Sequence, residues 1–201
     1  MKKWLWIIPV IFFVVSVPLL FYSKTSHKDE KAVDYIKNLK SYSAESNIIV
    51  VNDKQALEYN CKQYYDRKIG GRIEVGDSRV FIYKDNKTYV NDLKSNMKYT
   101  VDRDFDIIFN ISMVSEYIKL MYTDEEIKIS SKSIEGIEYV MVELHMPYMN
   151  RNLVKGRIYL NKDNYLPERL EILDSSNRIK VRVNYKNFIP NEEIDENLFN
   201  L

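Results

Sequence analysis

The sequence predicts an α+β domain in which a strongly curved antiparallel β-sheet packs around one long apolar helix, with a further helix at the N-terminal side. Two observations support this fold class. Short segments that alternate apolar and polar residues recur along most of the chain, separated by turn residues. One stretch, residues 104–122, is apolar around most of a helical circumference, so it needs cover on several sides.

The first 25 residues have the pattern of a signal-anchor or transmembrane segment. Residues 1–3 carry two lysines, and residues 4–22 contain no charged side chain. That run approaches the roughly 20 residues needed to span a bilayer core, and the lysines before it favour a cytoplasmic N-terminus. Residues 23–25 make a poor cleavage site, so we favour an uncleaved anchor, with a cleaved signal as the alternative.

Residues 26–201 then form one β-rich domain, because no internal repeat or Pro/Gly/Ser linker divides them. Ser26 and Asp29 resemble a capping box, and the helix that follows would place Val33, Ile36 and Leu39 on one side. Strand patterns come next. Before the long helix they cover residues 44–52, 56–65, 72–75, 79–83, 88–91 and 97–101.

After the long helix, strand patterns resume and include the clearest alternation in the chain. Ile179, Val181, Val183 and Tyr185 alternate with Lys180, Arg182, Asn184 and Lys186, which predicts one dry and one wet face. The other predicted strands in this half cover residues 126–130, 140–146, 154–160 and 166–173.

Composition excludes some classes of function. The chain has 201 residues with 30 basic and 29 acidic side chains, a formal net charge of +1. A nucleic-acid-binding protein needs a concentrated basic face, so we do not expect a nucleic-acid partner. Cys61 is the single cysteine, which rules out an intramolecular disulfide. Its place in an alternating strand favours a buried small hydrophobe over an exposed reactive thiol.

Residue types that carry chemistry do not form a recognisable catalytic, metal or cofactor site. His27, His145 and Cys61 lack zinc-ligand spacing, and His145 is better explained as a structural strand residue than as a general base. Gly70 and Gly71 indicate a strand break, since no phosphate-loop pattern follows them. Solvated charge is the simplest explanation for the remaining candidates: Glu125, Glu126, Glu192, Glu193, Lys180, Arg182 and Lys186.

Without catalytic machinery, two binding functions stay open. A curved sheet around an apolar helix can enclose a cavity for a lipid or a lipoprotein acyl chain. The same scaffold can offer strand edges and loops to a protein partner or to a second copy in a homodimer. Bulky helix residues favour a filled interior and hence a protein partner. These residues are Phe105, Ile108, Phe109, Ile111, Met113 and Met121.

The C-terminal part of the chain contains a recognisable series of short motifs: KGRIYL at residues 155–160, NYLPERL at 164–170 and NYKNF at 184–188, with an ending at Ile194 and Phe199. This series resembles the final hairpin and ending of the LolA/LolB lipoprotein-carrier superfamily, and within it the GerS group of spore germination lipoproteins. One position differs, because no lipobox Cys follows the apolar run. The motif is structural, so it implies a half-barrel fold and does not identify catalytic residues.

The resemblance also implies a function. A GerS-like protein is expected on the extracytoplasmic face of a membrane, in the forespore envelope of a sporulating cell. There it would bind and activate a zinc-dependent N-acetylmuramoyl-L-alanine amidase of the CwlD type, which modifies spore cortex peptidoglycan before germination. The protein itself would be non-enzymatic and would need no cofactor. The residues that bind the partner are not assigned by the sequence.

Overall fold

The computed structural model describes residues 29–201 except 53, 104, 125, 148 and 149. The predicted signal-anchor at residues 1–25, together with Ser26, His27 and Glu125, lies outside the described residues. Within the described part of the chain, no helix combines the length and apolarity needed to cross a membrane.

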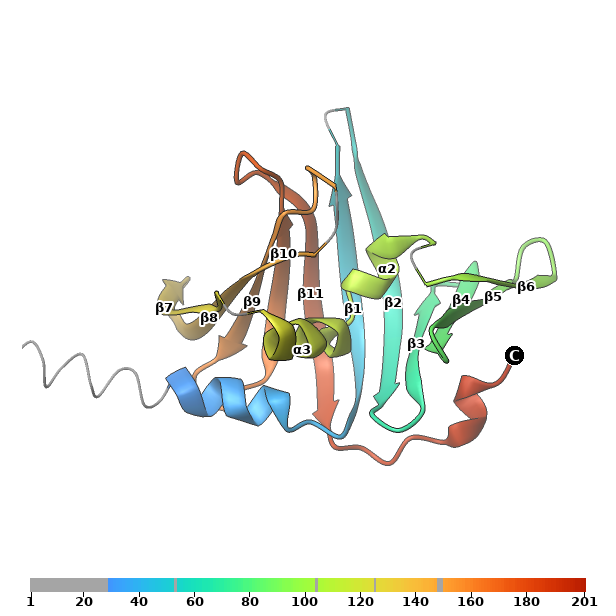
Figure 1. The fold of residues 1–201 in the computed structure, drawn as a ribbon, viewed down its shortest axis with the longest axis horizontal. Coiled ribbons are helices and arrows are strands. Elements are labelled where there is room, and N and C mark those ends of the chain that lie inside the picture. The colour runs from blue at the N-terminus through green and yellow to red at the C-terminus, as the bar shows by residue number, and fades with distance from the viewer. Residues whose placement is uncertain (1–28, 53, 104, 125, 148–149) are drawn as a thin grey trace, which may run out of the picture.

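The domain is built on one antiparallel sheet of 11 strands in the order β6-β5-β4-β3-β2-β1-β11-β10-β9-β8-β7 (Figure 1). Two meanders therefore meet where the first strand pairs with the last. The strands are β1 (Ser41–Val51), β2 (Ala56–Asp66), β3 (Gly70–Val75), β4 (Arg79–Lys84), β5 (Lys87–Asp92), β6 (Met97–Asp102), β7 (Lys128–Ile134), β8 (Ile137–His145), β9 (Lys155–Asn161), β10 (Pro167–Leu173) and β11 (Ile179–Pro190). Every predicted strand is present, with ends shifted by a few residues.

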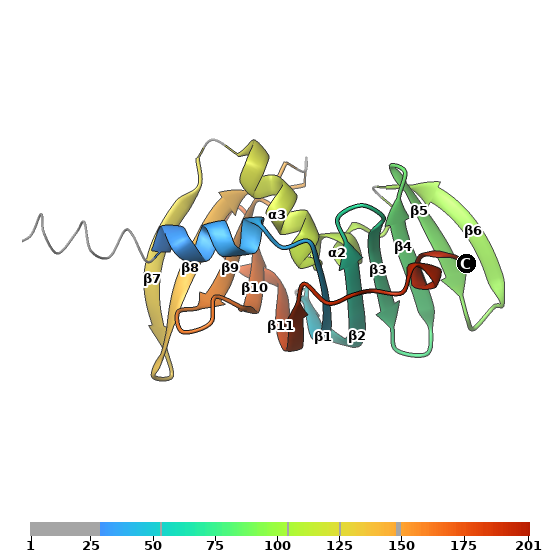
Figure 2. The ribbon, with the colours of Figure 1, turned by 90° about the horizontal axis from the view of Figure 1, so that it is seen from below.

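The helices cover the concave face of this sheet (Figures 1 and 2). Residues 29–37 are helical and pack Val33 and Ile36 into the main core, together with Leu39 just beyond them. The predicted single helix over residues 104–122 is corrected to two shorter ones, α2 (Ile107–Ile111) and α3 (Val114–Thr123).

Ser112 and Met113 cause the break between α2 and α3. The Ser112 hydroxyl donates a hydrogen bond of 2.7 Å to the Ile108 carbonyl, a local contact that competes with the helix ladder. Met113 is extended, with φ −84° and ψ 133°. The Ser112 carbonyl is thereby free to accept bonds from the sheet.

That carbonyl is the centre of a buried polar cluster. It accepts hydrogen bonds from Gln63 Nε2 at 3.1 Å and from the Tyr185 hydroxyl at 2.8 Å. Gln63 Nε2 also donates to Ser46 Oγ at 3.0 Å, and the Ser115 backbone N–H donates to the Tyr42 hydroxyl at 3.3 Å. The helix break is therefore attached to strands β1, β2 and β11 at the centre of the sheet.

Side chains fill the space between the helices and the sheet. Met113, Tyr117 and Met121 on or beside α3 are almost fully buried, and Phe81 stacks on Phe109 with ring centroids 5.2 Å apart. Strand β11 has the predicted register, because Val181, Val183 and Tyr185 are buried in this core. On its opposite face, Lys180 and Arg182 pair with Asp174 and Glu171.

A smaller core lies on the convex face. The C-terminal 3₁₀ helix η1 (Glu196–Phe199) brings Phe199 against Val80 and Ile82. Arg72 Nη1 donates to the Leu198 carbonyl at 2.6 Å, and Lys84 Nζ donates to the Phe199 carbonyl at 2.9 Å. The chain end is thus fixed to β3 and β4.

Two strand glycines set how closely the helices approach the sheet. A Cβ atom at Gly156 would lie 2.6 Å from Tyr117 Cε2 and 3.0 Å from Met146 Sδ. A Cβ atom at Gly71 would lie 2.9 Å from Met113 Cε, the end of a flexible side chain. Gly156 therefore faces a rigid ring, whereas Gly71 faces a group that can move.

We predict that Gly156→Ala destabilises the domain by about 1–3 kcal/mol, the usual cost of overpacking a filled core. The Tyr117 ring would have to shift, which strains its 2.9 Å hydrogen bond to the Val142 carbonyl. Gly71→Ala is the matched control and should cost clearly less. Urea denaturation of the two variants measures the difference, and equal costs would show that the interior is loosely packed.

Candidate interaction groove

Among the described residues that the sequence singles out for chemistry, His145 and Glu126 lie near each other at the surface. His145 is exposed: its backbone N–H donates to Asp124 Oδ2 at 2.8 Å, and its ring Nε2 lies 3.8 Å from Glu126. Cys61 is buried, which raises the pKa of its thiol to about 12 and keeps it protonated at neutral pH. No group of metal-ligating side chains occurs within the described residues.

The remaining candidates have structural contacts. Gly70 and Gly71 open β3, where a Cβ atom at Gly70 would lie 2.3 Å from the Tyr83 carbonyl oxygen. Glu192 binds β1 through the hydroxyls of Ser41 and Ser43. Glu193 lines a hollow beside the C-terminal segment. These contacts position the chain and bring no reactive groups together.

A groove lies between α2 and the ends of strands β3 to β5, and sequence reasoning did not identify it. Its floor is apolar, formed by Tyr59, Val75 and Phe109, and its volume is about 530 Å³. Tyr59 and Phe109 meet edge to face, with ring centroids 5.3 Å apart. We call it the α2 groove. It is lined by Tyr59, Val75, Ser78, Arg79, Asp92, Lys94, Ser95, Asp106 and Phe109.

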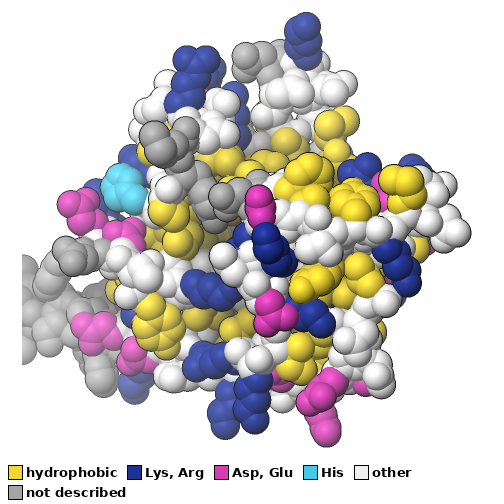
Figure 3. Space-filling model, turned by 45° about the vertical axis from the view of Figure 1, so that its right-hand side comes forward, with side chains coloured by type: hydrophobic (Ala, Val, Ile, Leu, Met, Phe, Trp, Pro, Cys, Tyr) yellow, Lys and Arg dark blue, Asp and Glu magenta, His cyan; other side chains and the backbone are white. Residues whose placement is uncertain are grey.

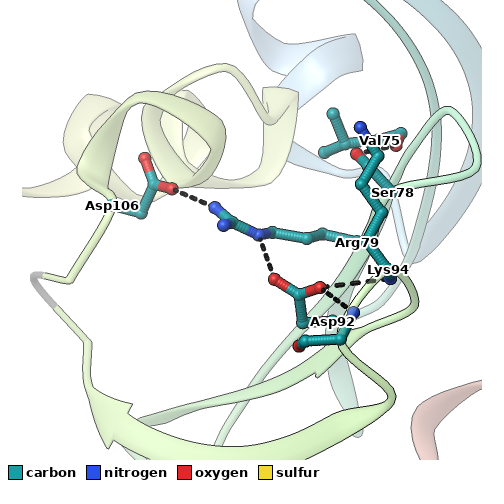
Figure 4. Close-up of polar contacts among 7 residues, drawn as sticks. Val75, Ser78, Arg79, Asp92, Lys94 and Asp106 are labelled. Atoms are coloured by element: carbon teal, nitrogen blue, oxygen red, sulfur yellow. Dashed lines mark hydrogen bonds and ion pairs between the residues drawn. The ribbon is translucent and has the colours of Figure 1, made fainter.

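Arg79 organises the charged rim of the α2 groove (Figure 4). Its Nε donates to Asp92 Oδ2 at 2.9 Å, and its Nη1 lies 3.9 Å from Asp106 Oδ2. The other Asp92 oxygen accepts the backbone N–H groups of Ser95 at 3.0 Å and Lys94 at 3.2 Å. One arginine therefore lies between the β5–β6 turn and the start of α2.

The two carboxylates of this rim are in opposite electrostatic situations. The Ser95 backbone N–H and the Arg79 guanidinium lower the pKa of Asp92 to about 2. Burial raises the pKa of Asp106, and Arg79 only partly offsets it. Asp106 also has a left-handed backbone, with φ 51° and ψ 52°, a conformation that Asp and Asn tolerate better than most residues. Asp106 is therefore the weakly neutralised member of the rim.

A second hollow continues the α2 groove around the β3–β4 turn. We call it the turn hollow; its volume is about 440 Å³. It shares Tyr59, Val75, Ser78 and Lys94 with the α2 groove, so the two form one depression. Its other lining residues are Glu58, Asn60, Gly76 and Asp77.

Large exposed hydrophobic side chains flank this depression. Leu57 lies two residues before Tyr59 on β2, Leu93 lies between Asp92 and Lys94, and Phe105 directly precedes Asp106. Met97 is opposite Asp92 in the β5–β6 pairing. Figure 3, which brings the β6 side of the molecule forward, shows hydrophobic side chains gathered on this face. Such clustering marks an interaction surface more often than a solvent face.

The sequence predicts the residues around α2 but not their exposure at this site. The sequence predicts Phe105 in the filled interior, and this is wrong: the side chain is 47% exposed because the helix begins two residues later, at Ile107. The arrangement offers an apolar floor, a fixed guanidinium and an under-neutralised carboxylate.

Comparison with known proteins gives one family. The family model described as sporulation protein YdcC-like matches residues 1–199. A search of curated proteins gives no match.

Among solved structures, an uncharacterized conserved protein from Thermus thermophilus is similar with a TM-score of 0.56 and 9% identity, over 87% of this chain and 92% of that one. A chain in the structure of the Clostridioides difficile CwlD amidase in complex with the GerS lipoprotein has 23% identity and a TM-score of 0.49, over 83% of this chain and 94% of that one. The LolA superfamily protein NE2245 from Nitrosomonas europaea has 10% identity and a TM-score of 0.46, over 86% of this chain and 97% of that one. The first of these similarities shows the fold alone.

The two rim carboxylates should respond oppositely to neutralisation. We predict that Asp92→Asn lowers the melting temperature at pH 7, because the ionised form is favoured in the folded state. The difference in stability between wild type and Asp92→Asn should shrink as the pH falls from 3.8, the usual pKa of an Asp side chain, to about 2. At that pH the wild-type carboxylate is itself protonated in the folded protein.

Asp106→Asn should instead raise the melting temperature at pH 7. The raised pKa means that ionised Asp106 opposes folding at neutral pH, and this penalty disappears as acid protonates it. Asn also tolerates the left-handed backbone well. Thermal unfolding from pH 7 to acid tests both variants, and a destabilised Asp106→Asn protein would mean that the Arg79 pair outweighs the burial of Asp106.

Proposed function

The chain belongs to the family of YdcC-like sporulation proteins, and on that premise we propose that it is a non-enzymatic envelope protein that binds and activates a cell-wall amidase. The partner would be a zinc-dependent N-acetylmuramoyl-L-alanine amidase of the CwlD type. Through this partner the protein would act on spore cortex peptidoglycan and so on germination.

Family membership is the observation that carries the proposal, because it places the chain among proteins of sporulation. The class of partner comes from the resemblance of residues 155–199 to the GerS group. The family supports a role in sporulation, and the GerS resemblance adds the cell-wall amidase.

The structure supports binding at the surface over binding in an interior cavity. The interior holds buried side chains such as Met113, Tyr117 and Met121, which leave the domain to act through its surface. The α2 groove and turn hollow offer apolar area next to fixed charges, the composition of a protein-binding hot spot. The exposed ring of Phe105, which directly precedes Asp106, lies at the margin of the α2 groove.

A lipid or lipoprotein carrier or sensor is the alternative function. The apolar floor at Tyr59, Val75 and Phe109 could hold part of an acyl chain. The carboxylates of Asp92 and Asp106 at the rim disfavour an anionic phospholipid headgroup, so we rank this alternative second.

The proposed location follows from the N-terminal segment. An uncleaved anchor at residues 1–25 would hold residues 26–201 on the extracytoplasmic face, in the forespore envelope. An amidase acting on peptidoglycan would meet the domain on that side.

We expect the full-length chain, purified in detergent, to form a stoichiometric complex with a CwlD-type amidase and to raise its hydrolysis of cortex peptidoglycan. Size-exclusion chromatography with light scattering measures the complex, and muropeptide release measures the activation. Mass spectrometry of an organic extract of the purified chain should find no stoichiometric lipid. A bound lipid together with no amidase complex would make the carrier function the better proposal. A homodimer would appear in light scattering of the chain alone as twice the protein mass of one copy.

The surface can be tested with a matched pair of exposed residues. We predict that Phe105→Ser weakens amidase binding by about tenfold or more, as expected for an aromatic hot-spot residue. Ile189→Ser is the control, since Ile189 on β11 is equally exposed, 48% against 47%, and has no sequence neighbour that lines the groove, whereas Phe105 directly precedes Asp106. Equal loss of binding in both variants would place the partner elsewhere.

A further inference from the structure

Strand β2 is much longer than the neighbour on its outer side. It pairs with β1 along its whole length, from Ala56 opposite Val51 to Asp66 opposite Ser41. Pairing with β3 begins only at Cys61, opposite Val75. The β1–β2 hairpin therefore projects beyond β3, as Figure 1 shows, and residues 56–60 have a strand on one side only.

The backbone of this segment presents unpaired groups to the free side. The Asn60 carbonyl accepts the Gly76 N–H at 2.9 Å, so the peptide groups of residue 60 point away from β1. Because backbone groups alternate along a strand, those of Glu58 and Ala56 point the same way. We call residues 56–60 the open β2 edge.

The depression formed by the α2 groove and the turn hollow runs along the open β2 edge. Tyr59 lines both hollows, whereas Glu58 and Asn60, which alternate with it along the strand, line the turn hollow. Successive side chains of a strand added here would alternate between the Tyr59 side and the Glu58 and Asn60 side of the edge, which is how strand addition combines affinity with specificity.

The outer sheet edges and the open β2 edge carry charges of opposite sign. Strand β6 carries Lys98, and β7 carries Lys128 and Lys132, the charge that natural proteins place most often on edges to prevent pairing. The charge in residues 56–60 is Glu58, and Leu57 is 40% exposed. The hairpin edge therefore remains open to a partner strand.

Charge selects the kind of segment that fits. The two hollows are lined by four carboxylates, on Glu58, Asp77, Asp92 and Asp106, and by two cations, on Arg79 and Lys94. Arg79 is already engaged by Asp92 and Asp106. The depression therefore favours a cationic occupant with apolar side chains for the floor.

We propose that the open β2 edge binds an extended segment of the partner protein by strand addition. The segment alternates apolar residues, which enter the α2 groove, with Lys or Arg residues, which face Glu58 and Asp77. This inference rests on the proposed function for the identity of the partner, and on the geometry alone for the mode of binding.

The experiment uses the full-length chain in detergent and two fluorescent seven-residue peptides of alternating Val and Lys or alternating Val and Glu. The Val–Lys peptide should bind, and the Val–Glu peptide should bind at least about tenfold more weakly. Glu58→Pro removes the N–H that faces the free edge and leaves the β1–β2 ladder intact, so it should reduce Val–Lys binding by about tenfold or more. Glu58→Gln, which keeps that N–H, should retain most of the binding.

Each result has a distinct meaning. Unchanged binding by a Glu58→Pro protein with wild-type melting temperature would overturn strand addition. Asp77→Lys provides a second test, because it should weaken binding of the Val–Lys peptide without changing the backbone of the edge. Competition by a short-chain phosphatidylcholine, which is zwitterionic and does not attract the cationic peptide, would instead identify the groove as a lipid site and overturn strand addition. If the peptides behave as expected but no amidase binds, the proposed partner is wrong and the inference stands. If the amidase binds wild type and Glu58→Pro equally, the partner is right and the inference fails.

Discussion

The Ser112 carbonyl is the contact on which the rest of the domain depends. An open sheet of 11 strands has two distant ends, and the segment that carries α2 and α3 connects one meander to the other. Gln63 and Tyr185 bind that segment at its break and fix it to the central strands. A buried carbonyl with two donors is costly to move, because any shift leaves polar groups unpaired. Both helices are thereby held in place over the concave face.

This arrangement determines where the molecule can meet a ligand. With α3 seated against Gly156 and Met113 against Gly71, the centre of the concave face is occupied by the protein itself. The short α2 does not extend to the ends of β3 to β5, and the depression opens there. This domain of the YdcC-like sporulation family thus has a filled interior and a depression at the margin of its sheet.

Period-two alternation was sufficient to predict the strands, because one face of each strand contacts the core, and β11 shows this most clearly. The helix break could not be predicted, since Ser112 is stable there only through Gln63 and Tyr185, which are distant in sequence. Part of the α2 groove could be predicted from the sequence. Gly70 and Gly76 limit β3 to six residues beside the 11 of β2, so the unequal lengths were readable, but the position of α2 above them was not.

The central pairing of β1 with β11 has a consequence for how the chain folds. Ile48 lies opposite Val183 and Val50 opposite Val181, so the middle of the sheet forms between segments at opposite ends of the sequence. Such nonlocal contacts form slowly because a long loop must close first. During synthesis the first meander can assemble while one side of β1, with its run Ile48-Ile49-Val50-Val51, waits for the last strand. This nascent state exposes a hydrophobic strand edge, so the folding intermediate, more than the finished protein, is the species that a chaperone must protect from aggregation.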